Sequence, residues 1–192
     1  MIDQAFNCVK HFIKKNDIDE SHAIKHSIEV MRFATDIYLS ELPSNPHLSS
    51  QKSVILAAAI LHDMCDHKYL PSESEAIREI REFMSDHLTS KELDIIVSII
   101  TTMSYSKVKK NGYPDLGEYQ LAYHIVREAD LLAAYDMDRC TIYGMFVNNL
   151  DYSTAVARAT ELYESRVMKY ISDGLFITEY SKRKSMDLQN TR

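Results

Sequence analysis

The stretch Val54-Ile55-Leu56-Ala57-Ala58-Ala59-Ile60-Leu61 decides the fold, because it is apolar on every side and leads directly into His62-Asp63. Its three alanines favour helix over strand. A helix that is apolar all round belongs at the centre of a core, so we expect the other elements to pack around it. The run is far shorter than the roughly 20 apolar residues that span a bilayer, and we therefore expect no membrane segment.

Apolar periodicity predicts helices along most of the remaining chain. The capping box Thr89-Ser90-Lys91-Glu92 marks the start of one helix, whereas Asn111-Gly112 and Pro114 predict a loop over 103–117. No strand alternation of useful length occurs, so we expect an all-α single-domain bundle of seven or eight helices. These helices are expected over 3–15, 21–38, 50–66, from after 71 to 84, from 89 onward, over 118–134 with a continuation as far as 146 left open, over 154–171 and briefly after 175.

The composition is that of an ordinary globular domain. The chain has 192 residues, of which 45% are hydrophobic and 26% charged, with only 4 Gly and 4 Pro, and this excludes disordered and collagen-like classes. It carries 28 acidic and 22 basic residues, a net charge of −6. Extended nucleic acid is therefore not an expected partner, because binding to the phosphate backbone depends on Lys and Arg. A small anionic substrate in a local basic pocket is compatible with this charge.

The cysteines and the N-terminus bear on the cellular compartment. Cys8, Cys65 and Cys140 are odd in number and far apart, and no CxxC occurs, which argues against a disulfide framework and a thiolate zinc site. The first residues lack the basic region and apolar core of a signal peptide. We expect a soluble, reduced, cytoplasmic protein.

Metal-ligand types of side chain occur on apolar helix faces. His26 lies one turn before Val30 on a stripe expected to face inward; alone, it would be read as a core histidine satisfied by a hydrogen bond. Asp130 shares a face with Val126 and Ala133. A buried carboxylate at this position needs a cation, either a Lys or Arg side chain or a metal ion.

The pair His62-Asp63 ends the apolar helix, where two adjacent side chains can reach one small ion from two sides. A carboxylate is unfavourable at a helix C-terminus, which weakens the alternative of a charged terminus in water. Asp66 stands at i+4 from His62 and is expected to face the same region. His26, His62, Asp63 and Asp130 offer two imidazoles and two carboxylates, a donor set that suits one divalent Mn, Zn, Fe, Co or Ni ion.

The order His … His-Asp … Asp resembles the HD-domain superfamily of metal-dependent phosphohydrolases. The resemblance extends from about residue 19 to about 144. It implies an HD-type bundle with a motif-bearing core over about 19–146, C-terminal helices over 153–183 and a polar tail over 184–192. The stretches that carry it are Ser21-His22-Ala23-Ile24-Lys25-His26-Ser27-Ile28-Glu29-Val30, Ala59-Ile60-Leu61-His62-Asp63-Met64-Cys65-Asp66 and Glu128-Ala129-Asp130-Leu131-Leu132.

The resemblance also implies roles for individual residues. The two imidazoles and two carboxylates named above would be the metal ligands. Asp66 matches an acidic position that assists hydrolysis in several subfamilies, and Lys68 resembles a lysine found in small stand-alone members; both are expected to be catalytic. His22 matches a partner histidine of the first motif and is expected to lie beside the ligands and the substrate.

One motif departs from the family pattern. Many relatives carry His-Ser-aromatic-Ser where this chain has Met103-Ser104-Tyr105-Ser106. Members with two metals need two further histidines, for which His67, His87 and His124 are available. His124 stands six residues before Asp130, about 240° around a helix, so the two do not easily face one centre. We expect a single metal ion.

Three lysines, Lys107, Lys109 and Lys110, lie close together in this otherwise acidic chain. Beside a metal they could hold phosphate oxygens, with Ser104 and Tyr105 adding hydrogen bonds; the alternative is a solvated surface loop. Two arginines that flank Asp130 are alternative anion contacts, Arg127 and Arg139. The expected substrate-binding residues are His22, Ser104, Tyr105, Lys107, Lys109 and Arg139.

The function expected from these features is hydrolysis of a nucleotide or another small phosphate ester by a metal-activated water. One alternative is a non-catalytic metal-binding or nucleotide-sensing module, and another is an oxygen-using di-iron enzyme, against which the missing histidines speak. The expected partner is a small phosphorylated substrate, and assembly into a homo-oligomer is left open.

Overall fold

Helix α3 (Lys52–Leu61) lies at the centre of the molecule, as its apolar sequence predicts. Every residue from Val54 to Leu61 is buried. The structure, a computed structural model, describes residues 1–66 and 72–190. Within these ranges it contains ten α-helices, three short 3₁₀ helices and no strand. The prediction of an all-α domain is confirmed, although the number of helices is higher than the seven or eight expected.

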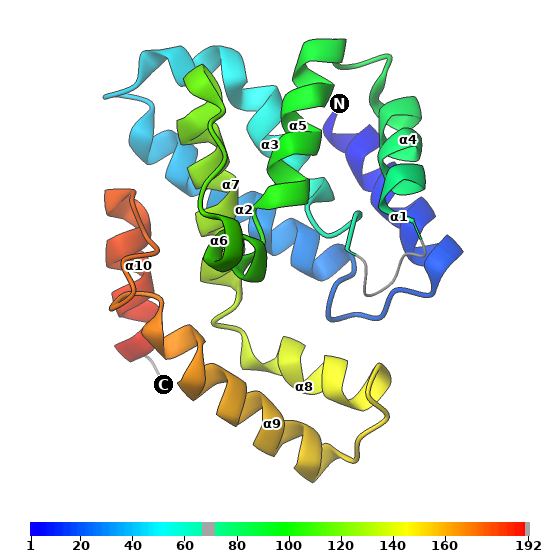
Figure 1. Cartoon of the computed structure of the whole chain (residues 1–192), viewed down its shortest axis with the longest axis vertical. Helices are drawn as coiled ribbons and strands as arrows, with labels where there is room; N and C mark the ends of the chain where they lie inside the picture. Colours follow the sequence, from blue (N-terminus) through cyan, green and yellow to red (C-terminus); the bar gives the residue numbers. More distant parts are fainter. Residues whose placement is uncertain (67–71, 191–192) are drawn as a thin grey trace.

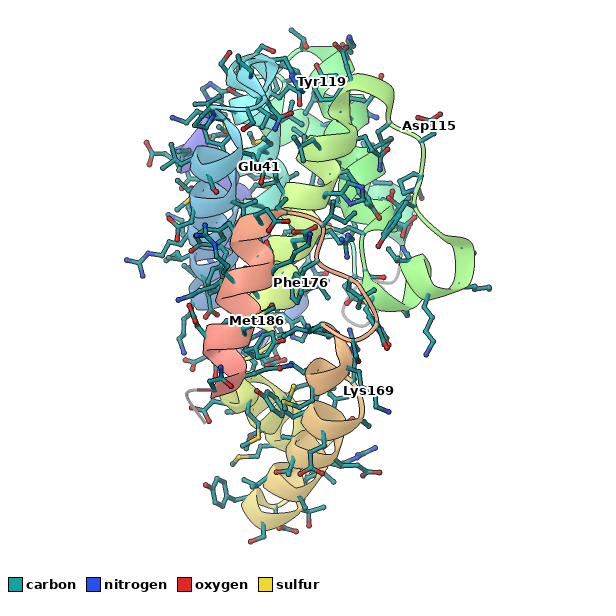
Figure 2. All side chains as sticks on the ribbon, turned by 90° about the vertical axis from the view of Figure 1, so that its left-hand side faces the viewer. Glu41, Asp115, Tyr119, Lys169, Phe176 and Met186 are labelled. Atoms are coloured by element: carbon teal, nitrogen blue, oxygen red, sulfur yellow. The ribbon has the colours of Figure 1, made fainter. Side chains whose placement is uncertain are left out.

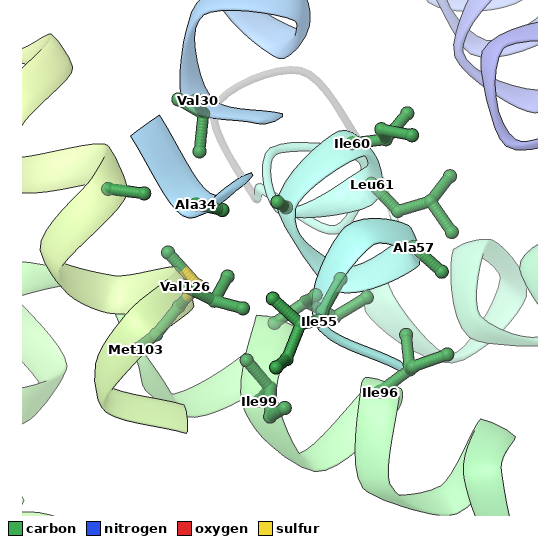
Figure 3. Packing of buried hydrophobic residues seen from close by; sticks show 14 of the residues in the cluster. Val30, Ala34, Ile55, Ala57, Ile60, Leu61, Ile96, Ile99, Met103 and Val126 are labelled. Atoms are coloured by element: carbon green, nitrogen blue, oxygen red, sulfur yellow. The ribbon is translucent and has the colours of Figure 1, made fainter. Parts of the chain in front are cut away.

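Four long helices surround α3. They are α1 (Ile2–Asn16), α2 (Ile24–Glu41), α5 (Ser90–Thr102) and α7 (Gln120–Ala133), and each packs against it. Figure 3 shows Ile55 of α3 beside Ile99 of α5 and Val126 of α7, with Val30 of α2 across the same core. Burial of such side chains stabilises the fold by about 1.5–3 kcal/mol each, so these contacts fix the relative positions of α2, α3 and α7.

Helices α4 (Glu73–Met84) and α5 begin at capped N-termini. Ser72 accepts a hydrogen bond from the Glu75 backbone N–H at 3.2 Å. At α5, the predicted capping box is present: Thr89 accepts from the Glu92 N–H, and the Glu92 carboxylate accepts from the Thr89 N–H. Such caps satisfy backbone donors that have no partner inside the helix, so these two sequence signals place the helix starts.

Helices α8 (Met137–Phe146) and α9 (Tyr152–Ser165) pack closely against each other, below the rest of the chain in Figure 1. A Cβ atom at Gly144 would lie 3.1 Å from the Ala155 Cβ, so glycine permits this close approach. The 3₁₀ helix η3 (Val167–Lys169) follows α9, and α10 (Glu179–Asn190) then lies against α2 and α7. Figure 2 shows α10, with Met186, running alongside α2.

Two element boundaries differ from the prediction, and the structure decides a third that was left open. The loop expected over 103–117 is wrong over 105–111, where α6 (Tyr105–Asn111) forms; this helix is only seven residues long and is followed by Gly112, at φ 75°. A break separates α7 from α8, where the Asp136 carboxylate caps α8 by accepting from the Asp138 N–H. Helix α3 ends at Leu61 instead of continuing to 66, since a turn over residues 62–65 replaces its last part.

The C-terminal helix is longer than the short segment expected after 175. It continues through Asn190 and buries Ser185, so residues 184–190 belong to a packed helix. Two further 3₁₀ helices, η1 (Pro46–Gln51) and η2 (Gly117–Tyr119), precede α3 and α7. In the described ranges no helix combines the length and the apolar character that crossing a membrane requires.

Candidate metal centre

Side chains from three parts of the core meet at one point. His26 projects from the first turns of α2, His62 directly follows α3, and Asp130 lies near the end of α7. The Nε2 atoms of His26 and His62 are 2.9 Å apart, and one ligand atom from each of the three residues lies within 4.8 Å of the other two. The packing of α2 and α7 on α3 therefore brings together residues that are 36 and 68 positions apart in the sequence.

Asp63 adds a second carboxylate. Its Oδ2 lies 3.3 Å from the Nε2 atom of both His26 and His62. Oδ1 of Asp130 lies 3.5 and 3.6 Å from the same two nitrogens. Ligand bonds of about 2.0–2.2 Å to a small divalent ion would place neighbouring ligand atoms about this far apart, so each carboxylate oxygen lies at a suitable distance from the two nitrogens. The group whose ligand atoms all lie within 4.8 Å of one another consists of His26, His62 and Asp130.

The imidazole of His62 is oriented by the end of the core helix. Its Nδ1 lies 2.9 Å from the backbone carbonyl of Ala59, which can only accept, so Nδ1 carries a proton and donates. Ala59 is in the last turn of α3, where carbonyls have no partner within the helix. The bond leaves Nε2 as the ligand atom, and metal-ligating histidines commonly donate their other ring N–H in this way.

The pKa values of His62, Asp63 and Asp130 are strongly shifted in this cluster. Burial alone would lower the pKa of His62, but the carboxylates of Asp63 and Asp130 raise it to about 10. The reverse holds for Asp63: burial alone would raise its pKa, but His62 and then His26 hold it well below its usual range. The pKa of Asp130 is lowered for the same reason, against the effect of burial. The imidazoles thus favour the charged form of each carboxylate.

The imidazoles are more deeply buried than the carboxylates. The side chains of His26 and His62 are 1% and 2% exposed, whereas those of Asp63 and Asp130 are 16% and 28% exposed. Asp130 is thus less buried than its apolar helix face predicted.

His22 and Arg139 lie next to the cluster. His22 precedes α2 instead of lying on it; its Nδ1 is 2.6 Å from the Ser21 Oγ, and its ring packs edge-on against His26. Arg139 donates from Nε to the Ser21 carbonyl at 2.7 Å, and its Nη2 is 3.9 Å from Oδ2 of Asp63. Ser21 therefore contacts both of these predicted substrate-binding residues, His22 through its hydroxyl and Arg139 through its backbone carbonyl.

A small cavity beside His26 contains a residue that the sequence argument missed. Its volume is about 70 Å³, and Glu29 and Arg139 contribute to its lining. Burial, and then the nearby Asp136, raise the pKa of Glu29. Glu29 stands at i+3 from His26, so the helical spacing that singled out His26 could have identified it.

Asp66 does not occupy the helical position expected for it, since α3 ends at Leu61. It follows the turn, where its backbone N–H donates to the Asp63 carbonyl at 3.1 Å, and it is partly exposed. It is not among the converging ligand atoms. Lys68, the other residue expected to be catalytic, lies outside the described residues.

The predicted residues of 104–109 lie on and beside α6. Ser104 precedes the helix, and its Oγ is 3.5 Å from the Ser106 Oγ. The ammonium group of Lys107 donates to the Thr101 carbonyl at 2.7 Å and lies 3.3 Å from a Glu73 carboxylate oxygen. Tyr105 and Lys109 instead line a larger cavity between α6 and α7.

The histidines considered for a second metal are not part of the cluster. His124 packs edge-on against Tyr113, with ring centres 4.9 Å apart, and its Nε2 lies 3.3 Å from the Gln120 amide nitrogen. His87 is exposed in the turn after α4, and His67 lies outside the described residues. In residues 1–66 and 72–190, the cluster around His26 is the one group of three or more such side chains close enough to share an ion.

Comparison with known proteins finds a solved structure with a similar fold. No family model matches the chain, and no curated protein matches it. The crystal structure of a Lactobacillus plantarum protein, a structural genomics target, is similar over 97% of this chain and 88% of its own, with a TM-score of 0.72 and 19% sequence identity. At this identity the likeness shows a shared all-α fold.

Proposed function

We propose that this chain is a metal-dependent phosphohydrolase of the HD type that acts on a nucleotide or another small phosphate ester. The observation that supports this most is the convergence of two buried imidazoles with two partly exposed carboxylates. A cluster that served packing alone would gain little from placing four titratable groups together, because removing them from water costs several kcal/mol per ion.

One divalent ion, Mn, Zn, Fe, Co or Ni, would be held by His26, His62, Asp63 and Asp130. Mixed nitrogen and oxygen ligands suit these ions, and two carboxylates balance the charge of a divalent cation. When bound, such an ion polarises a phosphoryl oxygen and lowers the pKa of a coordinated water.

The remaining chemistry falls to neighbouring side chains. The Asp66 carboxylate follows the ligand turn without belonging to the ligand set, and we assign it the role of proton acceptor. Arg139 is the cation best placed for phosphate oxygens, because its guanidinium lies beside Asp63 and can donate in pairs to an oxyanion. Lys107 is less well placed, since its ammonium group already contacts Thr101 and Glu73. His22, beside Ser21 and His26, offers a further polar group to the substrate.

The test combines metal content with turnover on a panel of phosphate esters. Asp63→Ala should lose both metal and activity, because it removes a ligand. Asp66→Asn should keep the metal and the melting temperature, but its turnover should fall about 10²–10⁴-fold, the usual contribution of a general base. Asp86→Asn, an exposed acid beyond α4, is the matched control and should change neither quantity.

Three results would contradict parts of this proposal. Equal metal content in the wild type and Asp63→Ala would remove the metal centre. Near-normal turnover in Asp66→Asn would remove Asp66 from the mechanism. Bound metal without turnover on any ester would favour the alternative, a non-catalytic metal-binding or nucleotide-sensing module.

A further inference from the structure

A second cavity, of about 330 Å³, lies between α6 and α7 and includes none of the four metal-centre residues. Its size falls within the range of about 300–1,000 Å³ typical of small-molecule sites. The chain just before α10 closes one side of it. The cavity is lined by Met103, Tyr105, Val108, Lys109, Gly112, Tyr113, Arg127, Leu131, Asp173 and Leu175.

Two aromatic rings in the lining are held in place by their neighbours. The ring of Tyr113 packs edge-on against His124, and the Arg127 guanidinium lies 5.0 Å from its centre. The ring of Tyr105 lies 5.6 Å from that of Tyr170, and the Arg166 guanidinium lies 4.2 Å from its centre. Rings that are already fixed can bind a flat ligand without losing much side-chain entropy.

Arg127 contributes a buried hydrogen-bond donor to the lining of the cavity. Its side chain is 2% exposed, and one Nη2 donates to the Leu175 carbonyl at 2.6 Å and contacts Glu128 at 3.3 Å. Its Nε has no hydrogen-bond partner among the residues that the structure describes. An unsatisfied buried donor is unfavourable, so a ligand that offers an acceptor near Arg127 would be favoured.

The charges of the lining residues and of Glu128 cancel, and Arg166 lies outside the lining, with its guanidinium against the Tyr105 ring. Glu128 balances Arg127 as a buried ion pair, and the lining contains one further base, Lys109, and one acid, Asp173. A site built for phosphate or carboxylate would carry excess positive charge. The lining therefore favours an uncharged ligand.

We propose that this cavity binds an uncharged, planar heteroaromatic ring with hydrogen-bond acceptors on its edge, such as a nucleobase. Tyr105 and Tyr113 would contact the ring, and Arg127 would donate to an acceptor. The proposal does not rest on the proposed hydrolysis, since it needs neither a metal ion nor a phosphate group. It concerns a site on α7 one turn away from Asp130, where residues three apart lie on neighbouring parts of the helix surface.

The experiment measures binding to the full chain by calorimetry, with a chelator present and with probes that contain no phosphate. The probes are adenosine, guanosine, cytidine, uridine and nicotinamide. Cyclohexanecarboxamide, which keeps the amide of nicotinamide but lacks a planar aromatic ring, is the matched control ligand. We expect at least one of the ring probes to bind and the cyclohexane compound to bind at least tenfold more weakly.

Two variants locate the site. Val108→Trp should fill the cavity, and Tyr113→Leu should remove a contacting ring; each should weaken binding about tenfold or more, in keeping with the contribution of aromatic stacking. Tyr152→Leu replaces an exposed tyrosine of α9 and should bind as the wild type does. Arg127 is left intact because it contacts Leu175 and Glu128.

The proposal fails if no ring probe binds, if the cyclohexane compound binds equally well, or if a folded Tyr113→Leu variant binds with unchanged affinity. Circular dichroism melting curves establish that each variant is folded. If Val108→Trp does not fold, Tyr113→Leu alone decides. A failure here leaves metal content and ester hydrolysis untouched, so it is distinguishable from a failure of the proposed function.

Discussion

Two carboxylates of α7, Glu128 and Asp130, are separated by one residue and have opposite surroundings. Glu128 is fully buried and accepts hydrogen bonds from the backbone N–H groups of Ile177 and Thr178, at 2.7 and 3.2 Å, and from the Thr178 hydroxyl at 2.7 Å. Arg127 supplies its counter-charge. Asp130 is partly exposed and has two imidazoles within 3.6 Å.

The contrast separates a structural acid from an available one. The oxygens of Glu128 are satisfied by the chain itself, so this residue ties the segment before α10 to α7. The Oδ1 atom of Asp130 lies close to two imidazoles, which are themselves metal-ligand types, and its side chain is 28% exposed. Burial alone therefore does not identify a functional carboxylate; the chemical nature of its partners does.

The largest expected effect comes from breaking the structural side of this contrast. Glu128→Ala leaves the buried Arg127 charge without a counter-charge and removes the acceptor of the Ile177 and Thr178 donors. We expect a loss of about 3–5 kcal/mol in the free energy of unfolding, measured by urea denaturation. Glu179→Ala, an exposed acid on α10, should change it by less than about 0.5 kcal/mol. A loss below about 1 kcal/mol for Glu128→Ala would show that the carboxylate is not what holds this segment.

Metal removal tests the Asp130 side of this contrast, the proposed metal centre. An ion that binds the folded chain and not the unfolded one stabilises it by about 2.7 kcal/mol when its free concentration is 100 times Kd. For a domain of this size, a chelator should then lower Tm by roughly 5–10 °C without unfolding the chain at room temperature. The Asp63→Ala variant should show no chelator effect. An unchanged Tm after verified metal removal would argue against a site shared by three helices.

His124 provides a smaller and pH-dependent comparison, because it is a buried imidazole whose pKa is shifted by burial and by a cation, Arg127, instead of by carboxylates. Burial, and then the nearby Arg127, lower its pKa from 6.5 to about 4. The unfolded chain therefore takes up a proton near pH 6.5 that the folded chain resists, so this contribution to stability is complete above pH 6.5 and is lost as the pH falls toward 4.

We expect His124 to account for about 2 kcal/mol of the stability lost between pH 7 and pH 5. Denaturation curves of the wild type and His124→Gln at both pH values measure it, and the variant should lose less stability over this interval. A parallel loss in both proteins would mean that other groups govern the acid response.

The sequence was most informative where one element met many constraints. The apolar run of 54–61 predicted a central helix, and the inward positions of His26 and Asp130 predicted that they would meet His62, as the structure confirms. Ligation of a metal ion by these residues stays a prediction. The apolar stripes of α2 and α7 were enough for this prediction, because both helices pack on α3 and turn their inward-facing side chains toward it.

What the sequence did not predict depends on short or long-range features. Helix α6 buries none of its seven residues and so has no clear apolar stripe, and the turn residues that follow it suggested a loop. The partners of Glu128 are 49 and 50 residues away, and no local pattern could indicate them. The break before α8 was left open, although Asp136, followed two residues later by Asp138, was a readable capping signal.

The bond between His62 and the Ala59 carbonyl has a consequence for how the chain can vary. The main chain of α3 sets the direction of this imidazole, so the length of the apolar run matters as much as its composition. Inserting or deleting one residue between 54 and 61 would turn His62 by about 100° and shift it by about 1.5 Å along the helix axis. A change of core register would thus misdirect the imidazole even if the helix remained fully apolar, whereas exchanges among Val, Ile and Leu at constant length would leave its direction intact.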